Sequence, residues 1–362
     1  MSLPLSALEA LPPADGRAAG ALLAAEFARL APRLAVLDDD PTGVQTVHGV
    51  HVYTGWEAEE LRRGLEEQAR LFFVLTNSRS FSPGETERAH REIGRNLAAA
   101  ARRAGRDFIP VSRGDSTLRG HWPLETETLR QALEGEGLGP YDGEIIVPFF
   151  PEGGRYTLGN VHYVREGEAL IPAGETEFAR DADFGYRASA LPQWCEEKSG
   201  GRVRAADVAC IPLEWLRALD VEAVARTLCG VRGFGKVVVN AADYADVAVF
   251  CAGLLRAMGA GKRFMLRTAA ALPKVLGGVP AAPLLGRADM LTGSGAAGPG
   301  AGAGRARRAR VAHRDGQPLP RHALRDFPRQ RGGGRYPAAG GLHAAGAVAG
   351  ETPQPLYRGS TG

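Results

Sequence analysis

The 362-residue sequence has only four cysteines, and no two of them form a CxxC pair. Their wide spacing indicates reduced thiols rather than a disulfide framework or a zinc site (Cys195, Cys210, Cys229 and Cys251). No stretch approaches the roughly 20 apolar residues that cross a bilayer. The N-terminus also lacks a signal-peptide pattern, because acidic residues interrupt its apolar ones. The sequence therefore predicts a cytoplasmic protein without a membrane partner.

Lysine is also scarce, and the first one in the chain is Lys198. The net charge of +3 hides two regions of opposite sign. Residues 298–362 contain eleven arginines and three acidic residues, a net charge of +8, so residues 1–297 carry −5. A mildly acidic body argues against a nucleic-acid partner.

Residues 298–362 contain no Ile, Met or Lys and no run of large apolar residues. Scattered apolar side chains cannot offset the entropy of ordering a chain, so we expect a poorly structured tail rich in Gly, Ala, Arg and Pro. One interpretation is a disordered basic arm. The other is GC-rich coding sequence read out of frame, which yields these four amino acids. The composition favours the second interpretation.

From residue 34 on, short apolar runs alternate with helical patterns. The runs predict strands at residues 34–37, 50–53, 71–75, 108–111, 144–147, 208–211, 236–240 and 264–266. The helical patterns lie mostly between them, at residues 58–70, 85–104, 124–133, 214–228, 244–258 and 268–276. This alternation is typical of an α/β fold with a mainly parallel sheet. It predicts a helical segment (1–33), an α/β domain (34–285), a linker (286–297) and the tail (298–362).

Polar segments follow three of the expected strands: DDDPTG (38–43), TNSR (76–79) and SRGDSTLRGH (112–121). The carboxyl ends of parallel strands meet at one edge of a sheet, where α/β proteins bind ligands. We therefore expect these segments to form one cleft. A fourth polar segment, PFFPEGGRY (148–156), follows the strand at 144–147 as a rigid loop.

The residue types in these segments suit a ligand with a carboxylate and several hydroxyls. Arg113, Arg119 and Arg155 are candidates for binding a carboxylate or a phosphate. The hydroxyls are assigned to the neighbouring polar side chains of Asn77, Ser78, Asp115, Ser116 and Thr117. For any single arginine, a surface salt bridge is an equally simple interpretation, and the loop at 112–121 can also be read as a solvated turn.

The sequence Asp38-x-Asp40-x-Thr42 also fits the nucleophile motif of haloacid-dehalogenase-type phosphatases. That family needs a lysine between its second motif and its final acidic pair, and none occurs before Lys198. Asp115 also lacks the second aspartate, four residues on, that would complete a magnesium site. This function stays as an alternative.

Taken together, the motifs resemble the four-carbon acid sugar kinases. The resemblance rests on LDDDPTG (37–43), TNSRS (76–80), SRGDSTLRGH (112–121), PFFPEGGRY (148–156), TEFARDADFGYRASALPQW (176–194) and RFMLRTAAALPKVLGG (263–278). It implies an enzyme that uses ATP and Mg²⁺ to phosphorylate threonate, erythronate or a 3-oxo-tetronate. It also implies an acid-sugar-binding domain followed by a nucleotide-binding domain.

Roles for individual residues follow from the resemblance and from their chemistry. Asp39 and Asp40 are the candidate catalytic residues, one as base or orienting group for the attacking hydroxyl and the other as an aid in holding Mg²⁺. A helix cap is the simpler reading of either one. The predicted substrate-binding residues are Thr42, Gly43, Asn77, Ser78, Arg79, Arg113, Asp115, Ser116, Thr117, Arg119, Gly154 and Arg155.

The resemblance ends before the expected nucleotide-binding domain. The glycines of the tail have no strand–loop–helix context, so we assign no ATP-binding residue to them. The histidines show no metal-ligand spacing, and we assign no metal ligand. We therefore expect a chain that binds a sugar acid but is weakly active or inactive as a kinase. A tetronate-binding module without turnover is the non-enzymatic alternative, and the sequence leaves a homodimer open.

Overall fold

A computed structural model of the chain describes residues 1–41, 44 and 46–282. The chain divides into a compact unit, Met1–Pro280, and a second unit that begins at Ala281. Only two residues of the second unit are described. Thr42, Gly43, the expected linker at 286–297 and the tail at 298–362 therefore lie outside the described residues. All that follows concerns the first unit.

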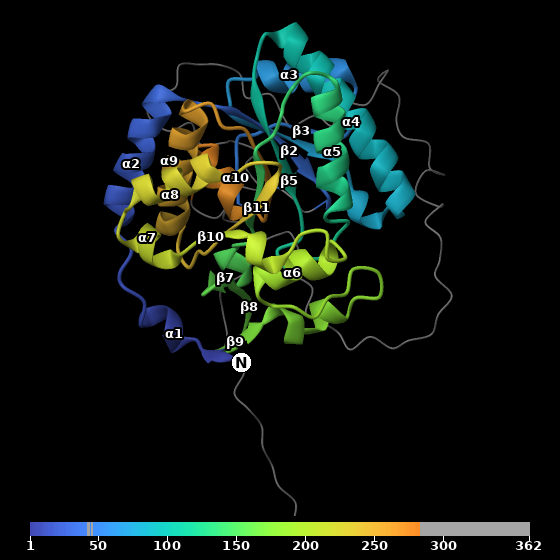
Figure 1. Cartoon of the computed structure of the whole chain (residues 1–362). Helices are drawn as coiled ribbons and strands as arrows, with labels where there is room; N and C mark the ends of the chain where they lie inside the picture. Colours follow the sequence, from blue (N-terminus) through green and yellow to red (C-terminus); the bar gives the residue numbers. More distant parts are fainter. Residues whose placement is uncertain (42–43, 45, 283–362) are drawn as a thin grey trace, which may run out of the picture. The chain divides into compact units, whose positions relative to one another are not determined.

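The central sheet confirms the expected α/β fold, and each of the eight expected strands is present (Figure 1). All paired neighbours in it are parallel. The order across the sheet is β10 (Ala209–Ile211), β11 (Gly235–Val239), β6 (Gly143–Val147), β12 (Phe264–Thr268), β5 (Phe108–Arg113), β2 (Arg33–Asp38), β4 (Leu71–Leu75) and β3 (Val52–Tyr53).

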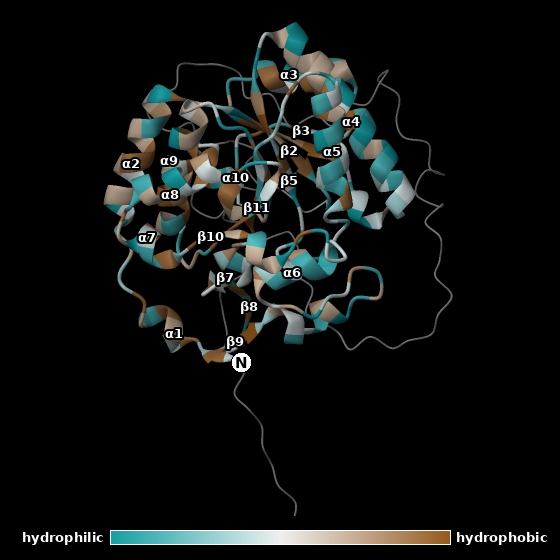
Figure 2. Cartoon of the chain, in the orientation of Figure 1, coloured by the Kyte–Doolittle hydropathy of each residue, from teal (hydrophilic) through white to brown (hydrophobic). Residues whose placement is uncertain are grey.

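Helices cover both faces of this sheet, which is why the strands read as continuous apolar runs. One face carries α3 (Ala58–Glu66), α4 (Pro83–Ala104) and α5 (Leu124–Gly135); the other carries α2 (Gly16–Arg29), α7 (Leu213–Arg217), α8 (Val221–Gly230), α9 (Tyr244–Gly259) and α10 (Ala271–Leu276). Along β2, Ala35 and Leu37 pack in the core beneath α3, α4 and α5. Leu34 and Val36 point the other way and pack in the core on the opposite face. Figure 2 shows the apolar colour gathered in the sheet and the hydrophilic colour on the outer helices.

The chain changes direction across the sheet at β5 and β12. These strands are neighbours, but β5 leads into α5 on one face and β12 leads into α10 on the other. Their following loops therefore diverge. In open α/β sheets such a point leaves a crevice at the carboxyl ends of the strands, and ligands bind there. The structure places the segment 112–121 at this crevice.

A small antiparallel sheet, in the order β1 (Leu3–Pro4), β9 (Ala169–Pro172), β8 (Val161–Glu166) and β7 (Arg155–Leu158), stands beside the large one. The sequence at residues 160–176, with a turn near 166–168, predicts a hairpin, and the structure has it as β8 and β9; the sequence does not predict β1 or β7. The expected helical segment at 1–33 contains α1 (Ser6–Glu9) and α2, and it also contains the strand Leu3–Pro4, which pairs with Leu170 and Ala169. A two-residue strand is too short to show an alternating pattern.

Two helix predictions also need correction. The single helix expected at 214–228 is two helices, α7 and α8, because Leu219 has a left-handed φ of 57° and the Asp220 carboxylate caps α8 at Ala223 N (2.8 Å). The helix expected to begin at 268 begins at Ala271, since Thr268 still pairs in β12.

None of the helices described in residues 1–41, 44 and 46–282 combines the length and the apolar character that a membrane span requires.

Candidate functional site

The candidate site is built from acidic and basic side chains at the carboxyl ends of β2, β4, β5 and β12. We call it the strand-end cluster and define it by eight residues: Asp38, Asp39, Asp40, Arg79, Arg113, Asp115, Arg119 and Arg267. Three of the polar segments that the sequence singles out contribute to it. Parallel pairing of β2 with both β4 and β5 brings their ends together.

Asp38 ends β2 and is paired with Arg113 at the end of β5, where Oδ1 lies 3.0 Å from Nη1. Both side chains are almost fully buried. Burial raises the pKa of Asp38 to about 6, although Arg113 acts in the opposite direction. Asp38 therefore belongs to a buried structural ion pair and is not an exposed carboxylate.

Asp39 and Asp40 share the guanidinium of Arg79, which follows β4. Arg79 Nη2 lies 2.6 Å from Asp39 Oδ1, its Nε donates to Asp39 Oδ2 at 3.2 Å, and its Nη1 lies 2.8 Å from Asp40 Oδ2. Burial raises the pKa of Asp39, and nearby Glu125 adds to the effect while Arg79 opposes it. Arg79, predicted to bind substrate, thus positions both predicted catalytic carboxylates.

Asp115 and Arg119 form a third pair, four residues apart in the loop after β5. Arg119 Nε lies 2.6 Å from Asp115 Oδ2, and the Thr117 hydroxyl donates to the same carboxylate oxygen. Burial alone would raise the pKa of Asp115, but Arg119 and Arg79 outweigh it and lower the pKa to about 2. Asp115 is therefore a permanent anion at neutral pH, and its negative charge is already balanced.

Two side chains hold this loop in place through its backbone carbonyls, His162 of the small sheet and Tyr186 of the segment that follows it. His162 of β8 donates from Nε2 to Ser116 O (2.8 Å) and accepts the Thr157 hydroxyl at Nδ1 (3.0 Å). The Tyr186 hydroxyl donates to Thr117 O at 2.6 Å. Ser116 and Thr117 therefore serve as anchors through their main chain. The Ser116 hydroxyl forms no hydrogen bond with any residue that the structure describes.

His162 predicts an acid-sensitive loss of stability. Burial lowers its pKa to about 4, whereas the unfolded chain has an ordinary histidine pKa near 6.5. Below pH 6.5 the unfolded state therefore binds a proton that the native state does not, and stability is lost as the pH falls through this window, by about 2–3 kcal/mol at pH 4.5. Urea unfolding of His162→Gln should show a flatter profile between pH 7 and 4.5 than the wild type.

His51→Gln is the comparison for this measurement, because the His51 imidazole is 66% exposed and its Nδ1 lies 2.7 Å from Glu67 Oε2. An exposed pair contributes no more than about 1 kcal/mol, so this substitution should change the pH profile by less than that. An equally steep acid loss in His162→Gln would show that another group causes it.

Two predicted hydroxyl-binding residues, Asn77 and Ser78, are adjacent in the chain but differ in exposure. Asn77 is exposed in a left-handed conformation with a φ of 53°, and its side chain donates to Ser80 Oγ at 3.3 Å. Ser78 is buried, and its hydroxyl accepts from Thr76 Oγ1 at 3.1 Å. The structure therefore leaves Asn77 available to a ligand and keeps Ser78 inside the turn.

Arg155 differs from the arginines of the strand-end cluster. It starts β7, donates from Nη1 to Gly153 O, and forms no ion pair with any carboxylate in the described part of the chain. Its Nε is buried without a hydrogen-bond partner. The backbone before it needs glycine, because Gly154 has a φ of 74° and a Cβ there would lie 2.8 Å from that of Arg165.

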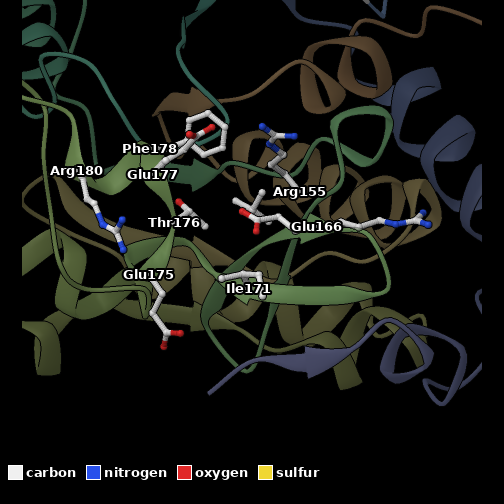
Figure 3. Close-up of a pocket in the computed structure, with 10 residues that line it drawn as sticks. Arg155, Glu166, Ile171, Glu175, Thr176, Glu177, Phe178 and Arg180 are labelled. Carbon is white, nitrogen blue, oxygen red and sulfur yellow. The ribbon is translucent and has the colours of Figure 1, made fainter. Parts of the chain in front are cut away.

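A cavity of about 530 Å³ opens on the β7–β9 side of Arg155. Its wall includes Val164, Ile171, Thr176 and Phe178, and Figure 3 shows Arg155 and Phe178 side by side at its edge. The Arg155 Cζ lies 5.4 Å from the centre of the Phe178 ring, and the Arg119 Cζ lies 5.2 Å from the same centre. Phe178 thus links the cavity to the strand-end cluster.

The sequence reasoning missed Arg267 and Glu125. Arg267 is buried on β12, and its Nε lies 3.2 Å from Glu125 Oε1 in the first turn of α5. The Ser112 hydroxyl also donates to Glu125 Oε1 at 3.1 Å. The sequence does contain a signal for Arg267, which is its charge. An arginine inside the apolar run at 264–268 is expected to be buried, and a buried charge needs a partner of opposite charge.

A sequence model for the family described as the sugar-binding N-terminal domain matches residues 34–276. No curated protein matches the chain. Among solved structures, one similar chain is a domain of unknown function from Bordetella bronchiseptica, described as a domain-swapped dimer with bound citrate. It is 22% identical to this chain with a TM-score of 0.47, and the match covers 68% of this chain and 55% of that one. A Haemophilus influenzae protein is 15% identical with a TM-score of 0.48, over 67% and 55%. The chain thus spans about 55% of the length of each of these proteins.

Proposed function

Because the chain belongs to the family of the sugar-binding N-terminal domain, we propose that it binds a four-carbon sugar acid and is the acid-sugar half of an ATP-dependent kinase. The motifs that resemble the four-carbon acid sugar kinases support the choice of ligand. They lie between residues 37 and 278, and the family model matches residues 34–276. The motifs therefore extend only two residues beyond the matched segment.

The observation that carries this proposal is the state of Arg155. A tetronate presents one carboxylate and up to three hydroxyls. Arg79, Arg113, Arg119 and Arg267 already form ion pairs with carboxylates of the protein, whereas Arg155 forms none within about 4 Å among the described residues, although Asp115 and Glu166 lie near enough to interact with it. Its buried Nε would gain a partner from a ligand carboxylate, and a charge-assisted hydrogen bond to arginine is among the stronger ones. Arg155 is therefore the proposed carboxylate-binding residue.

The hydroxyl end of the ligand is proposed to lie toward the strand-end cluster. Of the three aspartates after β2, Asp40 has the most exposed side chain, at 25% against 5% for Asp39 and 3% for Asp38. Asp40 is thus the carboxylate that can reach an acceptor hydroxyl and orient it, while Asp39 holds Arg79. Most of the catalysis in phosphoryl transfer comes from such positioning and from charge neutralisation.

Mg²⁺ and ATP belong to the proposed kinase, but the described residues do not fit a metal site. No group of three His, Cys, Asp or Glu side chains in residues 1–41, 44 and 46–282 is arranged to hold a metal ion. We therefore assign no step of this domain to the metal. Binding of ATP would need a second domain after residue 285. The sequence from there to residue 362 has no apolar periodicity from which such a domain could form. We propose that this chain binds a sugar acid and turns it over very slowly or not at all.

The phosphatase alternative is less consistent with this geometry. It requires Asp38 to attack phosphorus, yet the Asp38 side chain is 3% exposed and paired with Arg113. A nucleophile needs access to its substrate. The remaining alternative is a sugar-acid-binding module without turnover.

Calorimetric titration with D-threonate, D-erythronate and 3-oxo-tetronates tests the binding proposal. At least one should bind at millimolar concentration or below, and the neutral polyol erythritol should not, because it has no carboxylate for Arg155. The absence of binding by every acid would refute the site. A coupled ADP assay with the best ligand then tests turnover. A rate of about one per second, the low end for kinases, would contradict the expected inactivity.

A further inference from the structure

Arg267 is the member of the strand-end cluster that connects three separate segments of the chain. It is 4% exposed on β12, where its register partner on β5 is Ser112. Besides the ion pair with Glu125, its Nη2 donates to Arg119 O at 3.1 Å. One guanidinium thus joins β12, α5 and the loop that follows β5.

One glycine, Gly114, makes room for this side chain, and a second, Gly120, lies in van der Waals reach of it. A Cβ at Gly114 would lie 1.5 Å from Arg267 Nη1 and 2.1 Å from its Cζ, closer than any real contact allows. A Cβ at Gly120 would lie 3.5 Å from Arg267 Nη2 and 3.4 Å from Asp39 Oδ2. Arg267 therefore fills the space beneath the loop between Gly114 and Gly120, next to Asp39.

Gly114 is informative because its backbone does not itself require glycine. Its φ lies outside the left-handed region, in contrast to Gly120 with a φ of 121°. Alanine is thus conformationally acceptable at position 114, and the three nearest atoms that its Cβ would meet all belong to Arg267. The need for glycine at position 114 is a direct consequence of where Arg267 lies.

We propose that Arg267 is a positioning residue, whose guanidinium holds the loop at 114–120 and the Asp39 carboxylate in the arrangement that receives the ligand. Its Nε lies 3.2 Å from Glu125 Oε1, and its Nη2 and Asp39 Oδ2 both lie next to Gly120, so its positive charge is close to two buried carboxylates that would otherwise repel each other. The effect on ligand affinity rests on the proposed function. The effect on the loop does not.

A double-mutant cycle of Gly114→Ala and Arg267→Ala tests this role. The readouts are tetronate affinity by calorimetry and hydrogen exchange of the amides at 113–121. Each single substitution should weaken binding and speed exchange by about tenfold, and adding Gly114→Ala to Arg267→Ala should change either readout by less than about twofold. Such non-additivity is expected because the three nearest atoms that the alanine methyl would meet all belong to the Arg267 guanidinium.

Gly64→Ala is the matched control. A Cβ at Gly64 would lie 2.7 Å from the Phe72 ring at Cγ, in the core between α3 and β4, so this variant should lower the melting temperature without changing exchange at 113–121. If Gly114→Ala fails to fold, the milder Arg267→Gln is used, and it should still speed exchange of the loop. Equal effects of Gly114→Ala in both backgrounds, or an unchanged loop in Arg267→Gln, would overturn the role of Arg267. If no tetronate binds the wild type, the ligand proposal fails, while the exchange measurements still decide the role of Arg267.

Discussion

Replacing Glu144 with alanine should destabilise the protein by about 3–5 kcal/mol, because it leaves a buried ammonium without its counter-charge. Glu144 of β6 and Lys236 of β11 are register partners in the central sheet, and their side chains are 0% and 3% exposed. Lys236 Nζ lies 2.7 Å from Glu144 Oε2, and the Trp122 indole donates to Oε1 at 2.8 Å. Urea unfolding at pH 7 measures the loss.

The double substitution Glu144→Leu with Lys236→Met is the informative comparison. It removes both charges and leaves only the Trp122 indole N–H without an acceptor, so it should recover more than half of the stability that Glu144→Ala loses. A loss below about 1 kcal/mol in Glu144→Ala would mean that water reaches Lys236, since exposed ion pairs contribute no more than that.

Replacing Arg155 with methionine should weaken tetronate binding by about 1.5–3 kcal/mol, which corresponds to roughly ten- to a hundredfold in the dissociation constant. The substitution removes the guanidinium but keeps the apolar stem beside Phe178. The melting temperature should change little, because no ion pair of the described protein is broken. Calorimetric titration with the best wild-type ligand provides the measurement.

Arg165→Met is the matched control for Arg155→Met. Arg165 lines the same cavity, but its side chain is 45% exposed, and its Nη2 lies 3.7 Å from Glu168 Oε1. Its loss should change the affinity by less than about twofold, because exposed charges contribute little. If both variants weaken binding equally, general electrostatic attraction explains the affinity and Arg155 has no special role.

The strand-end cluster could be located from the sequence because its cause is local. Three of the apolar runs end in polar segments that contribute to it, and parallel strands must bring such ends to one edge. The pairs Arg79–Asp39 and Arg113–Asp38 join segments that the sequence treats separately. The position of the cluster thus followed from strand periodicity and chain direction alone.

The state of each charge in the cluster could not be predicted in the same way. The sequence offers Arg113, Arg119 and Arg155 as equivalent carboxylate-binding candidates. The structure pairs the first two with Asp38 and Asp115 and leaves Arg155 without an ion pair among the described residues. Ion pairing depends on which side chains packing brings within about 4 Å, and spacing along the chain does not contain that information.

The amino-acid sequence by itself determined the eight strands, the helices between them and the edge of the sheet where the site lies, because hydrophobic periodicity is a property of neighbouring residues. Tertiary structure alone decided the strand order, in which β12 enters between β5 and β6 from more than a hundred residues away. That insertion places Arg267 beneath Gly114 and opposite Glu125. Such a contact arises only when distant segments pack together, so no local pattern could reveal it.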